Sequence, residues 1–322
     1  MKSYLAPVYR WARRWSRGGV LLTLGLLGIV RLFQPEISIS VQLVIALIAL
    51  LVGIPHGAID HLIAIPSHPR SRFALYIIIY ISIAVLAGWA IAKWNAIGFQ
   101  IVILMSALHF GFGDASFINE GKDATESPRN PLWVETLYAL PAGFLPVVLP
   151  LTDHRTLDAL NRINPHLDNW AGSHVHQIRQ VVLFVALFAI VTLFLRGRGN
   201  LSVDLVLLAI LSLFAPPLIA FAAYFGFWHA LRHTARLVSK LKSADALAAA
   251  GRWESSIRGA IFPGLYAIAG TLVVAVFLMI ESPGKFSSSL LWSTLVIIWA
   301  LTVPHMLTTA ALDSRALTPL EG

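Results

Sequence analysis

Residues 73–93, which read FALYIIIYISIAVLAGWAIAK, decide the class of fold. This run has no charged residue before Lys93. At about 1.5 Å of rise per residue, a helix of this length crosses a hydrocarbon core of about 30 Å. Of the 322 residues in the chain, 57% are hydrophobic and 12% are charged, against roughly 25% charged in a soluble domain. The sequence therefore predicts an all-α, polytopic helix bundle that is embedded in a lipid bilayer.

Similar apolar runs recur along the chain, and they predict about ten transmembrane helices, with eight or nine as alternative counts. At Pro216-Pro217 we expect either one broken crossing or a tight hairpin. Residues 1–322 are predicted to form a single transmembrane domain, in which 1–18 is a basic cytoplasmic segment. The predicted spans are 19–34, 38–54, 73–93, 98–118, 132–151, 180–195, 201–216, 218–238, 260–281 and 289–311.

The basic residues predict how these spans are oriented. With the N-terminus in the cytoplasm, 17 Lys and Arg residues fall on the inner side and 5 on the outer side. Positive charge accumulates on the cytoplasmic side of membrane proteins. We therefore expect a multi-pass protein of the cell inner (cytoplasmic) membrane with both termini cytoplasmic. The net charge of +8 then encodes orientation, and nucleic acid is not an expected partner.

Histidines are the residues that point to chemistry. The chain has no cysteine, so disulfides, thiolate nucleophiles and cysteine ligands are excluded. Six of its 11 histidines lie within the predicted spans or at their cytoplasmic ends, where ionisable residues are costly and usually functional. They occur in Pro-His-Gly-Ala-Ile-Asp-His at 55–61, His-Phe-Gly-Phe-Gly-Asp at 109–114, Trp-His-Ala-Leu-Arg-His at 228–233 and Pro-His-Met at 304–306.

The depth of these histidines predicts one shared metal site. His109 lies about nine residues, or roughly 13 Å, from the cytoplasmic end of its span, and His229 lies at a similar depth. His229 and His233 are four residues apart, so both project from one helix face and can bind one metal. Imidazole binds Fe, Zn, Cu or Ni, so the metal stays open at this point. Asp60 and Asp114 are placed to orient the rings or to bind directly.

Other interpretations of these residues are available. Each histidine alone fits a buried group that is bonded to a backbone carbonyl. Arg232 fits a side chain that snorkels or pairs with an aspartate. Four further histidines, in the long loop 152–179, fit ordinary solvated residues, and we set them aside. These are His154, His166, His174 and His176.

The four motifs, in this order, resemble those of the membrane β-carotene 15,15'-dioxygenase family, often called the bacteriorhodopsin-related proteins. The resemblance implies an enzyme that uses Fe(II) and O₂ to cleave β-carotene at its central double bond. The products would be two all-trans-retinal molecules, destined for a rhodopsin. If the metal-binding positions of the family motifs are transferred to this sequence, the resemblance implies that the iron ligands are His56, His109, His229 and His233.

The remaining motif residues are candidate catalytic groups that orient the ligands or face the substrate. They are Asp60, His61, Asp114 and His305. An apolar polyene dissolves in the bilayer, so a metal at membrane depth suits it. A dry surrounding protects reactive oxygen species from water.

Three other classes of protein compete with this hypothesis. One is a different membrane iron oxidase, such as a desaturase or hydroxylase, although those have more histidines in HxxxH and HxxHH boxes. Another is a transporter whose histidines bind a metal or relay protons, but no internal duplication supports it. The third is a b-type cytochrome with paired axial histidines. Metal content and absorbance separate these classes.

Overall fold

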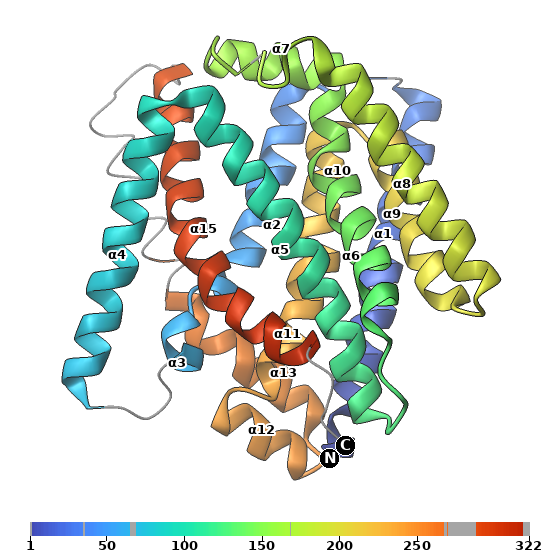
Figure 1. Ribbon diagram of the computed structural model, residues 1–322, viewed down its shortest axis with the longest axis vertical. Coiled ribbons are helices and arrows are strands. Elements are labelled where there is room, and N and C mark those ends of the chain that lie inside the picture. Colours follow the sequence, from blue (N-terminus) through green and yellow to red (C-terminus); the bar gives the residue numbers. More distant parts are fainter. Residues whose placement is uncertain are drawn as a thin grey trace.

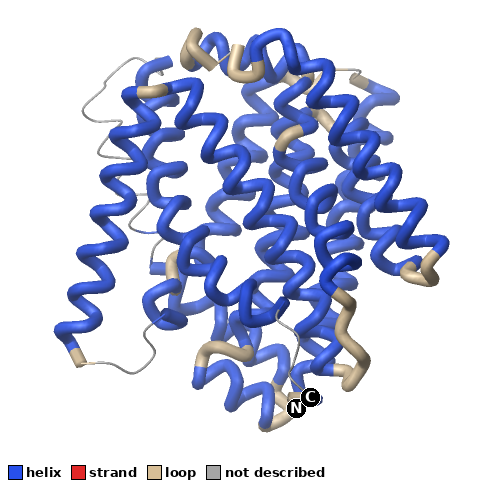
Figure 2. The backbone as a smooth tube through the Cα atoms, viewed as in Figure 1, coloured by secondary structure: helices blue, strands red, loops and turns tan. Residues whose placement is uncertain are grey.

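The computed structural model describes residues 2–34, 36–64, 69–167, 169–266, 269 and 288–317. Within these ranges all regular structure is helical (Figure 2). The prediction of an all-α fold is therefore confirmed.

Long helices run along the long axis of the molecule and form its body (Figure 1). Helix α7 lies across one end of the bundle and α12 lies at the other. The main helices are α1 (Ala6–Phe33), α2 (Ile39–Gly57), α4 (Arg70–Lys93), α5 (Asn95–Ala124), α6 (Leu132–Val147), α8 (Val175–Leu195), α9 (Gly199–Phe214), α10 (Pro217–Ala223), α11 (Ala230–Val238) and α15 (Ser288–Leu317). The shorter helices are α3 (Asp60–Ala64), α7 (His154–Ile163), α12 (Lys242–Ala249) and α13 (Trp253–Ile261), and single turns occur at 3–5, 149–152, 172–174 and 262–264.

Five helical stretches are long and apolar enough to cross a membrane, judged by length and composition. They are Ser3–Phe33, Arg70–Lys93, Asn95–Ala124, Gly172–Leu195 and Leu295–Ser314, and shorter apolar helices cover Val41–Leu50, Leu132–Val147 and Gly199–Phe214. The count of about ten spans is not confirmed by these lengths. The predicted span 260–281 lies largely outside the described residues.

The basic N-terminal segment belongs to the bundle. Helix α1 begins at Ala6, well before residue 19, where the first span was predicted to start. Its residues alternate with helical spacing, so that Val8 and Ala12 are buried while Arg10 and Arg14 are exposed. One helix therefore carries both the basic segment and the first apolar run, since its buried stripe continues through both.

The chain turns tightly at Pro216. Helix α9 ends at Phe214, Ala215 is extended and α10 begins at Pro217. Of the two expected arrangements, the structure therefore has the tight turn between two helices. After this turn the chain stays helical from Pro217 to Val238 and includes a π-helical segment, η4 (Tyr224–His229).

Helices α5 and α6 approach until their backbones touch. A Cβ atom added at Gly143 would lie 2.8 Å from the carbonyl carbon of Ala107, and one at Gly111 would lie 2.9 Å from that of Ala139. Only residues without a side chain allow this spacing. The contact sets α5, which carries His109, directly against α6.

Candidate metal centre

Four buried imidazoles gather in the middle of the bundle. His109 comes from α5, His229 ends the π-helical segment, His233 follows on α11 and His305 comes from α15. Each ring is at least nine-tenths buried. The ring centroid of His109 lies 5.2 Å from those of both His229 and His305. The centroid of His233 lies 5.7 Å from that of His229, 5.9 Å from that of His305 and 6.5 Å from that of His109. Three separate helices thus deliver histidines to one place.

Four of these five separations lie within the range for rings that share a metal, and the 6.5 Å between His109 and His233 lies just above it. A metal about 2.1 Å from an imidazole nitrogen lies about 3.2 Å from the centroid of that ring. If the two ring–metal directions form a tetrahedral angle, the two ring centroids are about 5.2 Å apart. If the rings lie on opposite sides of the metal, the centroids are about 6.4 Å apart, which is the upper limit. Within the described ranges, no three His, Asp or Glu side chains are already aimed at one ion position. The four buried imidazoles can be neutral, and neutral imidazole nitrogens are ligands that transition metals accept.

Polar partners hold two of these rings through Nδ1. The Nδ1 atom of His305 lies 2.9 Å and 3.0 Å from the two carboxylate oxygens of Asp60. The Nδ1 atom of His109 lies 3.1 Å from the hydroxyl of Thr309, which also donates to the backbone carbonyl of His305. Tyr80 donates its hydroxyl to Asp60 at 3.2 Å. A ring held through Nδ1 presents Nε2 as its donor atom to a metal.

Asp114 has different partners from those expected. Its carboxylate accepts hydrogen bonds from Arg232 at 2.7 Å, from the indole of Trp228 at 3.0 Å and from the hydroxyl of Tyr138. Arg232 also pairs with Asp204 at 3.0 Å. The buried guanidinium needs this carboxylate as a counter-charge, and the expectation that Asp114 orients an imidazole stays a prediction. The interpretation in which Arg232 pairs with an aspartate is the one that the structure shows.

His61 and His56 are the other two candidate histidines. His61, in α3, is half-buried, and its ring contacts that of Phe73 at a centroid distance of 5.9 Å. His56 lies in α2, but its side chain is outside the described part of the structure. The predicted loop 152–179 contains α7 and the start of α8. In it His154 lies beside Asp153 and His176 beside Gln180, both on the outside of the bundle.

The π-helical segment aligns aromatic rings with the histidine pair. Phe221 stacks on Phe225 at 5.6 Å, Phe225 stacks on His229 at 5.9 Å, and His229 stacks on His233 at 5.7 Å. The Phe225 ring fits because Gly53 of α2 has no side chain at the point of contact. Single turns of π-helix occur frequently at functional sites, since they change the direction in which side chains project.

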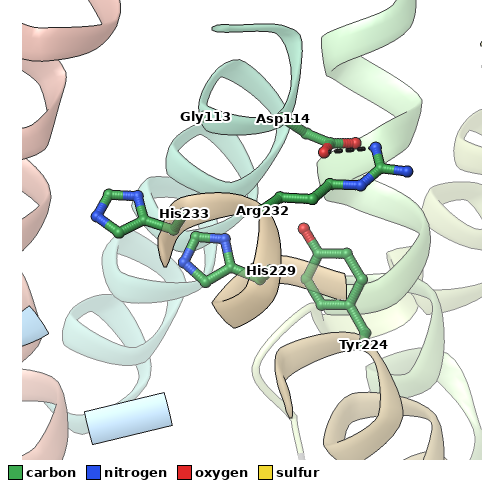
Figure 3. Close-up of a pocket in the computed structure, with 6 residues that line it drawn as sticks. All are labelled: Gly113, Asp114, Tyr224, His229, Arg232 and His233. Carbon is green, nitrogen blue, oxygen red and sulfur yellow. Dashed lines mark hydrogen bonds and ion pairs between the residues drawn. The ribbon is translucent and has the colours of Figure 1, made fainter. Parts of the chain in front are cut away.

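A small cavity borders the histidine pair. Its volume is about 10 Å³, enough for about one water molecule. Figure 3 shows His229 and His233 next to each other, with Tyr224 and the Asp114–Arg232 pair beside them. Tyr224 is fully buried, and its hydroxyl has no hydrogen-bond partner among the described residues.

Sequence reasoning missed Thr309 and Tyr80. Thr309 lies four residues after His305, so helical spacing alone would have placed both on one face of α15. Tyr80 belongs to the apolar run 73–93, which carries no signal for a polar contact. Its role depends on the packing of α4 beside α3.

The fold and the site define a helical protein with a buried imidazole cluster suited to a metal. A family model described as beta-carotene 15,15'-dioxygenase matches residues 47–313, so the chain belongs to this family. A relative named beta-carotene 15,15'-dioxygenase, from Uncultured marine bacterium 66A03, is 27% identical over 266 residues, covering 80% of this chain and 88% of the relative. No solved structure matches. The matched range contains all four histidine motifs, and the predicted family is confirmed; its members are carotenoid-cleaving dioxygenases.

Proposed function

We propose that this chain is a membrane-embedded, non-haem iron enzyme that uses O₂ to cleave β-carotene at the 15,15' double bond into two all-trans-retinal molecules. The observation that carries the proposal is the convergence of four buried imidazoles from three helices. Membership of the beta-carotene 15,15'-dioxygenase family supports the substrate and the bond that is cleaved.

The proposed ligands begin with the three cluster histidines that the family resemblance implies as iron ligands, namely His109, His229 and His233. His56 is a fourth by motif. His305 is a further candidate, because its ring lies 5.2 Å from that of His109 and its Nδ1 is held by Asp60. Bound Fe(II) would supply open positions at which O₂ is activated.

The protein residues around the cluster would orient the ligands and keep water out. Asp60 and Thr309 fix the planes of two rings through Nδ1. The ring of Phe110 lies 4.4 Å from that of His229, and Phe225 stacks on the same imidazole. These contacts surround the reacting centre with apolar groups, which favours chemistry on a polyene and protects reactive oxygen species.

The bilayer is the proposed surrounding of the protein and the source of its substrate. Large apolar side chains are exposed on the outer helices, for example Leu22 on α1, Ile78 on α4 and Phe184 on α8. Contiguous apolar surface of this extent marks contact with lipid. We propose that the chain lies in the inner membrane with both termini cytoplasmic, that β-carotene enters between helices, and that retinal passes to a rhodopsin.

Expression in β-carotene-producing bacteria tests the reaction. The expected result is loss of orange colour and the appearance of retinal in the pigment extract. A His233→Ala variant should stay orange, while His176→Ala, which alters a solvent-exposed histidine, should lose its colour like the unaltered chain. Intact β-carotene beside abundant, folded protein would contradict the proposal, and so would aldehydes from cleavage at another double bond.

Metal analysis of the purified protein separates the proposed enzyme from its rivals. We expect about one non-haem iron per chain, because the four rings surround one place. Two irons per chain would favour a desaturase-like oxidase. A Soret band would favour a b-type cytochrome, and substoichiometric metal would favour a transporter.

A further inference from the structure

We propose that a second site, at the end of the bundle where α7 lies, binds the phosphate of an anionic phospholipid. The site is a cavity of about 90 Å³ that shares no residue with the cavity beside the histidines. Its polar lining comes from four elements and comprises Arg31, Asp153, Arg155, Arg179 and Ser212. The proposal rests on the proposed membrane location and is independent of the proposed catalysis.

The charge of the lining favours an anion. Three guanidinium groups, from Arg31, Arg155 and Arg179, face one carboxylate, that of Asp153. Guanidinium groups bind phosphate oxygens through paired, charge-assisted hydrogen bonds. The volume is several times the roughly 10–15 Å³ that one water molecule needs, so a phosphate group has room.

Two of these arginines have hydrogen-bond or ion-pair partners within the fold, whereas Arg179 and Ser212 do not among the described residues. Arg31 donates to the backbone carbonyl of Phe214 at 2.6 Å and so caps the C-terminus of α9, and Arg155 pairs with Asp153 at 3.3 Å. Among the described residues, Arg179 forms no hydrogen bond or ion pair, and the Ser212 hydroxyl has no partner although the residue is only 8% exposed. A buried hydroxyl without a partner costs free energy. A phosphate oxygen in the cavity would supply the missing acceptor.

Apolar side chains next to the cavity select a lipid over a free anion. Leu32 and Phe33 follow Arg31 at the end of α1 and are 81% and 84% exposed. Phe214, which lines the cavity, is 59% exposed. An anionic headgroup beside exposed apolar groups matches a phospholipid, whose acyl chains would cover these side chains. The net positive charge of the lining favours phosphatidylglycerol over a zwitterionic lipid.

Native mass spectrometry of the full chain, purified in neutral detergent, tests the site. Phosphatidylglycerol, phosphatidylcholine and inorganic phosphate would be titrated separately, with the number of retained molecules as the readout. We expect phosphatidylglycerol to bind at least about tenfold more tightly than phosphatidylcholine, a difference of about 1.4 kcal/mol. Equal retention of the two lipids would overturn the proposal. Inorganic phosphate that displaces phosphatidylglycerol at equal concentration would also overturn it, because the site would then take a free anion.

Variants place the lipid at this cavity. The double variant Arg155→Gln/Arg179→Gln should lose the preference for phosphatidylglycerol, and Ser212→Ala should weaken it. The matched control is Arg162→Gln, which removes an exposed arginine from α7 at the same end. Retinal production should be unchanged in all of them, so a failure here is distinct from a failure of the proposed enzyme. Unchanged lipid preference in the double variant would refute the assignment.

Discussion

Substitution of Asp60 by Asn should weaken iron binding and leave the fold intact, whereas the same change at Asp114 should weaken the fold. The two carboxylates lie in neighbouring motifs and looked equivalent in the sequence. In the structure, Asp60 contacts the imidazole of His305, and Asp114 contacts the guanidinium of Arg232. The two variants therefore separate a residue that orients an imidazole from one that balances a buried charge.

The expected loss at Asp60 follows from its contact with His305. Both carboxylate oxygens lie within 3.0 Å of Nδ1, and Asn keeps one acceptor oxygen without the charge. A hydrogen bond to a charged group is roughly twice as strong as a neutral one, so the change costs about 1–2 kcal/mol. This corresponds to about tenfold weaker iron binding, at the lower end of the roughly 10- to 100-fold loss known for such partners. Excess Fe(II) should therefore restore most of the activity.

The expected loss at Asp114 is one of stability. Arg232 is 2% exposed, and among the described residues Asp204 is the one carboxylate that still pairs with it once Asp114 is replaced. Removing one partner of a buried ion pair costs about 3–5 kcal/mol, and the remaining aspartate favours the lower end. A loss of about 3 kcal/mol lowers the unfolding midpoint by about 6 °C. Excess Fe(II) should not restore this loss.

An iron titration of both purified variants checks these expectations. Bound iron per chain, retinal production and the thermal midpoint would be measured at each concentration of Fe(II), beside the unaltered chain. The reasoning is refuted if Asp60→Asn stays inactive at saturating iron with normal iron content. It is equally refuted if Asp114→Asn keeps the unaltered midpoint and responds to iron as Asp60→Asn does.

Three further predictions follow from the packing and the cluster. Gly143→Ala should destabilise the protein by about 3 kcal/mol, because the added Cβ atom would clash with the backbone of α5. Gly25→Ala should not destabilise it, because a Cβ atom added there has no atom within 4 Å. Thermal unfolding of both variants measures the difference. His305→Ala should bind less iron, while His176→Ala, which alters an exposed histidine, should bind a normal amount. Tyr224→Phe should leave the unfolding midpoint unchanged or raise it, since it removes a buried hydroxyl without a partner among the described residues. A marked drop would show that the hydroxyl has a strong partner.

The sequence anticipated the helical class of the fold and the family. Apolar runs as long as 73–93 leave few alternatives to a helix bundle, since every backbone group in lipid must bond within its own helix. The spacing of His229 and His233 likewise fixes their shared face, because it is set by the period of one helix. The helix that contains the predicted span 19–34 begins at Ala6, and the basic residues before Gly19 hid a buried stripe that includes Val8.

By itself, the sequence determined what depends on neighbours along the chain: the apolar helices, the absence of cysteine chemistry and the identity of the motifs. The tertiary structure decided which carboxylate meets which cation, because that depends on how separate helices pack. Asp60 reaches His305 from 245 positions away, and Asp114 reaches Arg232 from 118 positions away. Helical spacing relates residues a few positions apart, and it contains no information on the rotation of one helix against another. The close contact of α5 with α6 at Gly111 and Gly143 fixes how α5, which carries Asp114, faces α6, and a π-helical segment precedes Arg232.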